Sequence, residues 1–253
     1  MQAVVPAAGE GTRLRPLTED RPKGLVEVAG KPLLTHVFEA LCELDPTEIV
    51  VIDGYRGEDI RSHYGRRFDD VPLTYVRQES RRGLAHALLQ AEPHVTGDFV
   101  VLNGDNVVRA NLMDVVTRHR ETNADVTSLV EAVPSDRLGK GAVFKLADDE
   151  TVEGADTDTS IDSAAGGRII GIVEKPDDPP STFVPRGFYA FSPRIFSACR
   201  LVTPGETGEY ELTDAIDLLL AAGRRLETVR LDGWCHNVNT PEDRTLVASK
   251  LRV

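Results

Sequence analysis

Apolar and polar residues alternate along the first half of the chain with two different periods. Apolar side chains recur every three or four positions over residues 33–44, and residues 84–89 are rich in alanine and leucine, so helices are expected at both places. Short apolar runs that end in polar or glycine-containing turns are expected to be strands, at residues 3–5, 49–52, 73–76 and 99–102. Strands that alternate with helices predict an α/β fold whose mostly parallel sheet is covered by helices on both faces.

The second half of the chain is richer in expected strands. They lie at residues 126–133, 142–146, 169–173 and 188–191, and helices are expected near residues 212–222 and 241–251. Residues 147–168 form an acidic stretch of small residues without apolar periodicity, which predicts an exposed or mobile loop insertion. Because no repeat or linker divides the sequence, residues 1–253 are expected to form a single domain that carries this insertion near 147–168.

The loop after the first expected strand has the composition of a phosphate site. Right-handed crossovers place such loops along one edge of an α/β sheet, where ligands bind. Gly9 and Gly11 allow backbone N–H groups to turn toward one anion, and Thr12, Arg13 and Lys23 follow them. Guanidinium and ammonium groups suit phosphate oxygens. We therefore expect phosphate binding here; the alternative is a tight turn with arginines on the surface.

Two familiar phosphate-binding loops do not fit this segment. A P-loop ends in Gly-Lys-Ser/Thr, which residues 9–16 lack. The dinucleotide-binding fingerprint needs a small residue three positions after its second glycine, where this chain has Leu14, and Pro16 follows soon after. A helix is therefore not expected to begin directly after the loop, which weakens the alternative of a nicotinamide-dependent oxidoreductase.

The amino-acid composition of the chain argues against some classes of binding partner. The chain carries 29 Lys and Arg against 41 Asp and Glu, a net charge of −12, which argues against binding to nucleic acid. A high negative charge keeps a chain soluble, so adaptation to concentrated salt is one explanation and compositional drift is the other. The 3 scattered cysteines fit a reducing cytoplasm. No apolar run approaches the roughly 20 residues of a membrane span, and no membrane partner is expected.

Several segments, in a fixed order along nearly the whole chain, resemble those of the sugar-1-phosphate nucleotidyltransferases, the nucleotide-sugar pyrophosphorylases. They are residues 9–14 with Lys23, 30–34, 78–87, 102–106, 173–176, 208–214 and 240–243. The resemblance implies a Rossmann-like, three-layer α/β/α fold with a mostly parallel, mixed central sheet. It also implies Mg²⁺-dependent transfer of a nucleotidyl group from UTP or dTTP to a sugar-1-phosphate, with glucose-1-phosphate as the expected acceptor, and a possible homo-oligomer.

The resemblance assigns catalytic roles to Arg13, Lys23 and Asp105. In the family's reaction, the sugar-1-phosphate oxygen attacks the α-phosphorus and pyrophosphate leaves. Arg13 is expected to hold the leaving phosphates, and Lys23 to stabilise charge at the α-phosphoryl group or the leaving oxygen. Asp105 comes directly after a buried strand and is expected to hold Mg²⁺. Without the phosphate loop, an aspartate in a Gly-Asp-Asn turn would be the simpler interpretation of Asp105.

Further residues are expected to contact the two substrates. The expected nucleotide-binding set is Ala8, Gly9, Gly11, Thr12, Arg13, Gln78 and Gly83, and the expected sugar-phosphate-binding set is Gly141, Glu174 and Lys175. The amide of Gln78 offers a donor and an acceptor to a pyrimidine edge, and Gly83 leaves room for the base. Glu174 can accept hydrogen bonds from sugar hydroxyls, and Lys175 can pair with the sugar phosphate. The alternatives are an exposed glutamine at a strand end for Gln78, a glycine that opens a helix for Gly83, a solvated strand end for Glu174 and Lys175, and a plain β-turn at Gly141.

One position departs from the common family pattern. Aligned back from residues 240–243, Asn237 stands where the family often carries an aspartate as the second metal ligand. An amide oxygen can also bind Mg²⁺, but without charge, so metal binding should weaken. This departure keeps open a second hypothesis, a non-catalytic sensor of nucleotides or nucleotide sugars on the same fold.

Overall fold

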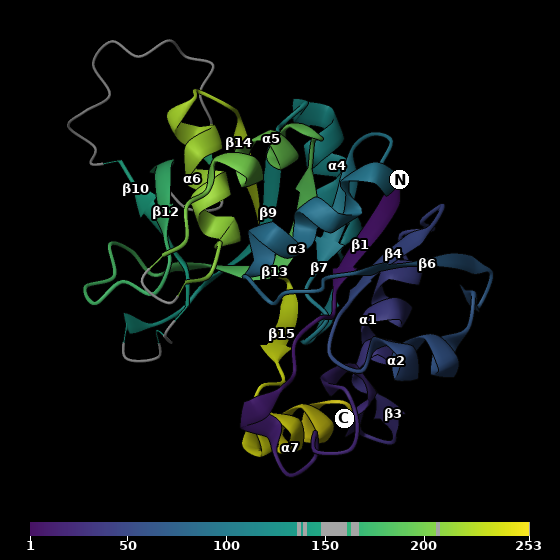
Figure 1. The fold of residues 1–253 in the computed structure, drawn as a ribbon. Helices are drawn as coiled ribbons and strands as arrows, with labels where there is room; N and C mark the ends of the chain where they lie inside the picture. The colour runs from purple at the N-terminus through teal and green to yellow at the C-terminus, as the bar shows by residue number, and fades with distance from the viewer. Residues whose placement is uncertain (136–137, 139–140, 148–160, 163–166, 206–207, 253) are drawn as a thin grey trace.

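The computed structural model describes all residues except 136–137, 139–140, 148–160, 163–166, 206–207 and 253 (Figure 1). An eight-stranded sheet runs through the molecule in the order β14–β9–β13–β7–β1–β4–β6–β5. In that order the strands are Leu226–Arg230, Val126–Ala132, Phe183–Phe191, Phe99–Leu102, Gln2–Pro6, Ile49–Asp53, Val71–Arg77 and Arg67–Phe68.

Strand directions make the sheet mixed but mostly parallel. Strands β7, β1, β4 and β6 run parallel to one another, and β14 runs parallel to β9. Strand β13 is antiparallel to both of its neighbours, and the short β5 is antiparallel to β6. This arrangement confirms the fold class expected from the sequence.

The central strands are long apolar runs because both faces of the sheet are covered. All five residues of β4 are buried, as is usual for parallel strands between two helix layers. Side chains of β1 alternate between the two sides: Val4 packs in one apolar cluster, and Ala3 and Val5 pack in the other.

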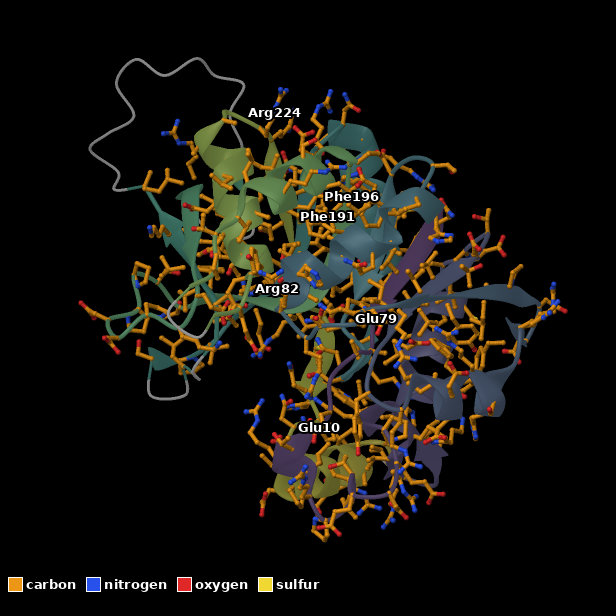
Figure 2. All side chains as sticks on the ribbon, in the orientation of Figure 1. Glu10, Glu79, Arg82, Phe191, Phe196 and Arg224 are labelled. Atoms are coloured by element: carbon orange, nitrogen blue, oxygen red, sulfur yellow. The ribbon has the colours of Figure 1, made fainter. Side chains whose placement is uncertain are left out.

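Helices form a layer on each face of the sheet. The layer on one face comprises α1 (Leu33–Cys42), α2 (Gly57–Tyr64) and α4 (Met113–Thr122), and the other comprises α3 (Leu84–Ala91), α5 (Arg194–Leu201) and α6 (Leu212–Ala221). Phe99 of β7 stacks on Phe196 of α5 with ring centroids 5.2 Å apart, and Phe191 of β13 lies beside Phe99. Figure 2 shows Phe191 and Phe196 close together under this second layer.

Two strands and a helix extend the fold beyond the eight-stranded sheet. Strands β8 (Asn106–Ala110) and β15 (Gly233–Asn237) pair antiparallel, and helix α7 (Pro241–Lys250) follows β15. In Figure 1, β15 runs downward from the middle of the molecule to α7 at the bottom, next to the purple N-terminal segment that holds the hairpin of β2 (Glu27–Val28) and β3 (Lys31–Pro32). An apolar cluster joins these parts; we call it the anchor cluster, and it contains Leu14, Val28, Leu33, Val107, Val238 and Val247.

A smaller antiparallel sheet lies beside α6. Its order is β10 (Val143–Leu146), β12 (Gly167–Val173) and β11 (Ile161–Asp162), and α6 packs on β12. The acidic insertion expected at 147–168 lies within this hairpin, but residues 148–160 and 163–166 of it are outside the described part of the chain. Among the described residues, no helix is both long and apolar enough to cross a bilayer.

Candidate active site

A cavity of about 550 Å³ opens at the carboxyl ends of the parallel strands, where ligands bind in open α/β sheets. Its walls come from residues 6–12 after β1, Lys23 and Gly24, several residues between 78 and 87 after β6, residues 103–105 after β7, and Glu209. The cavity therefore brings together most of the segments that the sequence singled out. Ala8, Gly9, Gly11, Thr12, Lys23, Gln78, Gly83 and Asp105 all line it.

The loop after β1 offers unpaired backbone donors to this cavity. Within the described residues, nothing accepts a hydrogen bond from the N–H groups of residues 8–12. Gly11 has φ +69°, and an added Cβ would lie 3.0 Å from the Lys23 side chain. The Thr18 hydroxyl donates to the Gly11 carbonyl at 2.8 Å, and Leu14 is fully buried in the anchor cluster. Thr18 and Leu14 thus fix the position of the loop, and its backbone N–H groups remain available to an anion.

Lys23 and Asp105 meet inside the cavity although 82 residues separate them. The Lys23 Nζ donates to Asp105 Oδ2 at 2.8 Å and to Asn239 Oδ1 at 2.7 Å, and only 12 % of the Lys23 side chain is exposed. Arg13 lies farther along the same loop, in the short helix η1 (Thr12–Leu14), with an exposed side chain and outside the cavity lining. Of the three expected catalytic residues, the structure brings two together, and the role of Arg13 stays a prediction.

Asp105 sits in a tight turn that is pressed against the end of β1 and the loop after it. The Asn106 N–H donates to the Asn103 carbonyl at 3.0 Å, and the Gly104 N–H donates to the Pro6 carbonyl at 3.0 Å. A Cβ on Gly104 would come within 2.6 Å of that same carbonyl, so only glycine permits this approach. The turn and the metal-site interpretations of Asp105 are therefore compatible, because the turn aims the carboxylate into the cavity.

The oxygen atoms of Asp105 would suit a magnesium ion, which would neutralise charge on substrate phosphates. Lys23 takes Oδ2, and no described residue donates to Oδ1. Asn237 ends β15 opposite Asn106, with an exposed side chain outside the cavity lining, and the Val238 N–H donates to the Asp105 carbonyl at 2.8 Å. No described group of three or more His, Cys, Asp or Glu could hold a metal. One carboxylate with neutral oxygens and substrate phosphates is a usual set for Mg²⁺.

Gln78 is buried in the wall of the same cavity. Its Nε2 contacts the Gly83 carbonyl at 3.2 Å and the His86 Nδ1 at 2.9 Å. Burial, helped by the charge of Arg82, lowers the pKa of His86, so the ring is neutral at pH 7 and Nδ1 can accept from the amide. Gly83 and His86 therefore occupy Nε2 of the Gln78 amide, which leaves Oε1 as the acceptor for a ligand; the sequence alone suggested a donor as well.

Gly83 is the N-cap of α3, as the helix-opening alternative expected, and it also makes a close contact that the sequence did not suggest. Its φ is +94°, and an added Cβ would lie 2.5 Å from the carbonyl oxygen and 2.6 Å from the nitrogen of Tyr210. The Tyr210 N–H donates to the Arg82 carbonyl at 2.7 Å, and the Arg82 guanidinium lies over the Tyr210 ring, 4.7 Å from its centroid. The close approach that requires glycine is made by the backbone of this chain, and Gly83 also lines the cavity.

Glu10 joins the two loops that flank the cavity, and sequence reasoning missed it. Its carboxylate accepts from Arg81 at 2.5 Å and from Arg15 at 2.8 Å. The hydrogen bond from Arg81 holds the pKa of Glu10 below its usual value, and Arg15 contributes in the same direction. Figure 2 labels Glu10 on the first loop and Arg82, the neighbour of Arg81, on the second. No local signal in the sequence pairs residues so far apart.

The three expected sugar-phosphate residues lie together but outside the cavity lining. The Lys175 N–H donates to the Gly141 carbonyl at 3.2 Å, and its Nζ lies 3.3 Å from Glu174 and 3.6 Å from Glu211. Burial disfavours the charge on Lys175, but Glu174 and Glu211 outweigh it and raise the Lys175 pKa. Burial, with the charge of Glu174, raises the pKa of Glu211. Glu209, two residues before Glu211, lines the cavity, and its charge also raises the pKa of Lys175 and of Glu211.

Comparison with known proteins confirms the resemblance found in the sequence. A model of the nucleotidyl transferase family matches residues 2–238. The UTP–glucose-1-phosphate uridylyltransferase AglF of Haloferax volcanii is 47 % identical over 252 residues, which cover 100 % of this chain and 97 % of that protein. A glucose-1-phosphate thymidylyltransferase of Streptomyces antibioticus is 32 % identical over 96 % of this chain, which spans only 64 % of that relative.

A solved structure agrees in fold. A UDP-glucose pyrophosphorylase complexed with UDP-glucose superimposes with a TM-score of 0.85 at 21 % identity, covering 99 % of this chain and 98 % of the other. An overlap of this extent supports the same three-layer architecture. Because the family model covers most of the chain and one relative is similar along all of it, this protein belongs to the nucleotidyl transferase family.

Proposed function

We propose that this protein transfers a nucleotidyl group from UTP or dTTP to a sugar-1-phosphate, with glucose-1-phosphate as the first acceptor to test, and releases pyrophosphate. One observation carries the proposal: the free amides after β1, the Lys23 ammonium, the Asp105 carboxylate and the Gln78 amide all face one cavity. This set suits a triphosphate, a cation and a base. The similarity to AglF along the whole chain supports the same reaction.

The arrangement is suited to in-line displacement at the α-phosphorus. A sugar-phosphate oxygen forms a new bond to that phosphorus while the bond to the bridging oxygen breaks and pyrophosphate takes the electron pair. The protein contributes position and charge rather than covalent chemistry. The loop amides bind the triphosphate, and Lys23 neutralises charge that grows in the transition state.

Asp105, with Asn237 as the second oxygen donor, is the proposed holder of Mg²⁺, which when bound neutralises charge on the phosphate oxygens. On strand β15, Asn237 pairs with Asn106, the residue directly after Asp105, and the Asn237 side chain is exposed. An amide in place of a carboxylate leaves the site with less negative charge. We therefore expect a higher magnesium requirement than a site with two carboxylates would have.

Base choice is proposed to rest on Gln78. With Nε2 held by Gly83 and His86, Oε1 can accept from the N3–H group of a pyrimidine. Uracil and thymine both carry that group, whereas cytosine carries an acceptor at N3. The cavity is therefore expected to reject CTP while it accepts UTP and dTTP. Glu174, Lys175 and Gly141, which lie together, are the proposed sugar-phosphate contacts.

The test is a pyrophosphate-release assay with glucose-1-phosphate and Mg²⁺, run separately with UTP, dTTP and CTP over a series of salt concentrations. Release with UTP or dTTP but not CTP is the expected result, together with the nucleotide sugar as product. Tight binding of UTP without turnover under all conditions would contradict the enzyme and favour the sensor hypothesis. The salt series also tests whether the −12 net charge reflects adaptation to concentrated salt.

We further propose that residues 1–253 act as one unit in a reducing cytoplasm. All three cysteines, Cys42, Cys199 and Cys235, are free thiols, and burial raises the pKa of Cys199 and of Cys235 to about 12. Thiols of this kind are poor nucleophiles and poor metal ligands. Size-exclusion chromatography with light scattering tests the possible homo-oligomer.

A further inference from the structure

The loop after β1, whose free amides suit an anion, also carries a carboxylate. Glu10 lies between Gly9 and Gly11, lines the cavity, and has 17 % of its side chain exposed. A carboxylate repels a triphosphate unless its charge is neutralised. Protonation does not neutralise it at pH 7, because the hydrogen bond from Arg81 lowers the pKa of Glu10. The position of this charge beside the loop amides therefore needs a physical reason.

Each oxygen of the Glu10 carboxylate accepts a hydrogen bond from a different arginine. Arg81 Nη1 donates to Oε2 at 2.5 Å, and Arg15 Nη2 donates to Oε1 at 2.8 Å. We call these three side chains the Glu10 triad. Two guanidinium groups and one carboxylate leave the triad with a net positive charge, so as a whole it attracts an anion. Glu10 and Arg81 line the cavity, whereas Arg15 does not.

Arg81 keeps most of its hydrogen-bond donors free. A guanidinium group has five N–H donors, and Glu10 is the one partner of the Arg81 side chain in the part of the chain that the structure describes. Lys23 is the other cation among the described residues of the cavity lining, and it already pairs with Asp105. Arg81 is therefore the cation in this lining with the most donors left for phosphate oxygens, which a guanidinium group can bind in pairs.

We propose that Arg81 is a second cation for the triphosphate of the nucleotide, and that Glu10 is the residue that positions it. The ion pair joins positions 71 residues apart, because Arg81 lies between β6 and α3, on the segment that begins with Gln78. Glu10 thus holds a guanidinium group from that segment beside the amides of the loop after β1. This inference rests on the proposed function and adds a nucleotide contact and its support.

The proposal and charge repulsion alone predict opposite effects of Glu10→Ala. The measurement is the dissociation constant of UTP with Mg²⁺, by titration calorimetry without a sugar phosphate. Removing a negative charge beside a phosphate site by itself tightens UTP binding. If Glu10 positions Arg81, E10A instead weakens UTP binding by about threefold to tenfold, because Arg81 loses its charge-assisted hydrogen bond. An E10A protein that binds UTP as tightly as the wild type, or more tightly, would overturn the proposal.

A double-mutant cycle of wild type, E10A, R81A and E10A/R81A tests whether Glu10 acts through Arg81. R81A should weaken UTP binding by on the order of tenfold, the effect of losing a charge-assisted contact. In the R81A background only the repulsion from Glu10 remains, so E10A should there tighten UTP binding, by about twofold. If E10A weakens UTP binding equally in both backgrounds, Glu10 acts on the loop itself and the proposal is wrong. R81K keeps the charge without the planar fork and should recover part of the affinity.

Arg15→Ala is the matched control, because Arg15 pairs with the same carboxylate from outside the cavity lining. R15A should bind UTP within about twofold of the wild type, since an exposed ion pair contributes little. A loss as large as that of R81A would mean that net charge, and not the position of Arg81, sets the affinity, which would contradict the proposal.

UMP as a second ligand separates a phosphate contact from damage to the rest of the nucleotide site. R81A should weaken UMP binding much less than UTP binding, because UMP lacks the two outer phosphates, and equal losses for both ligands would overturn the proposal. These titrations need no turnover. A wild-type protein that binds UTP but releases no pyrophosphate would contradict the proposed enzyme alone, and the cycle would still decide the role of Arg81. A wild type that binds neither UTP nor dTTP would refute both.

Discussion

Gly83→Ala is the substitution whose effect the structure specifies most closely. A Cβ at this position would lie 2.5 Å from the Tyr210 carbonyl oxygen, whereas ordinary contacts begin near 3.4 Å. The Tyr210 backbone must therefore retreat by about 0.9 Å, the difference between these two distances. That shift strains two hydrogen bonds, from the Tyr210 N–H to the Arg82 carbonyl and from the Ala85 N–H to the Tyr210 carbonyl.

Two effects lower the free energy of unfolding of the Gly83→Ala protein. An alanine at the observed φ of +94° is strained by about 1–3 kcal/mol. Each backbone hydrogen bond that is weakened costs up to about 1 kcal/mol. Together they predict a loss of about 1–5 kcal/mol in the free energy of unfolding, which for a chain of this length lowers the melting temperature by roughly 2–20 °C. KM for UTP should rise as well, because Gly83 and Leu84 line the cavity.

Calorimetry of G83A, G97A and wild type measures this prediction. Gly97 is the matched control, because a Cβ there meets nothing within 4 Å and its φ is not in the left-handed region. G97A should melt at or slightly above the wild-type temperature, since alanine reduces the freedom of the unfolded chain. A G83A protein as stable as G97A would refute the reasoning about Tyr210.

Three further predictions follow from the same geometry. Lys23→Met and Asp105→Asn should each lower kcat by about a hundredfold or more, and near-normal turnover in both would reject their assigned roles. Gly9→Ala should fold normally, because a Cβ there meets nothing within 4 Å, yet raise KM for UTP, since that space belongs to the cavity; calorimetry and kinetics on one sample check both halves. Burial lowers the pKa values of His36 and His119 below 6.5, so the stability due to these neutral rings is complete above pH 6.5 and is lost as pH falls below it. This prediction would be contradicted if the melting temperature of the wild type did not fall on acidification and if His119→Gln had the same melting temperature as the wild type at each pH.

The strands that position the site were predictable because a buried strand consists of apolar residues that follow one another in the sequence. Strands β1, β4 and β7 read as apolar runs in the sequence, since parallel strands between two helix layers are buried on both faces. Helices α2, α4 and α5 were not predicted, and for α2 the reason is that it buries little. In α2 only Gly57 and Ile60 are buried, so no apolar period marks the segment.

The chemical types at the site could also be predicted, but not all of their partners. Glycines after a strand, a lysine, and an aspartate after another strand are properties of short segments. The Glu10–Arg81 pair and the contact of Gly83 with Tyr210 join residues 71 and more than 100 positions apart. Nothing in either segment specifies the other, because such contacts depend on how the sheet orders its strands.

The amino-acid sequence by itself determined the alternation of strands and helices, the family, and the loop whose amides and cations suit a triphosphate, because periodicity and turn chemistry act over a few residues. Only the tertiary structure decided that Arg13 stays outside the cavity lining, that one face of Gln78 is already occupied, and that Glu10 pairs with Arg81. Those outcomes depend on close packing between distant segments, which fixes side-chain positions to fractions of an ångström and leaves no trace in local sequence.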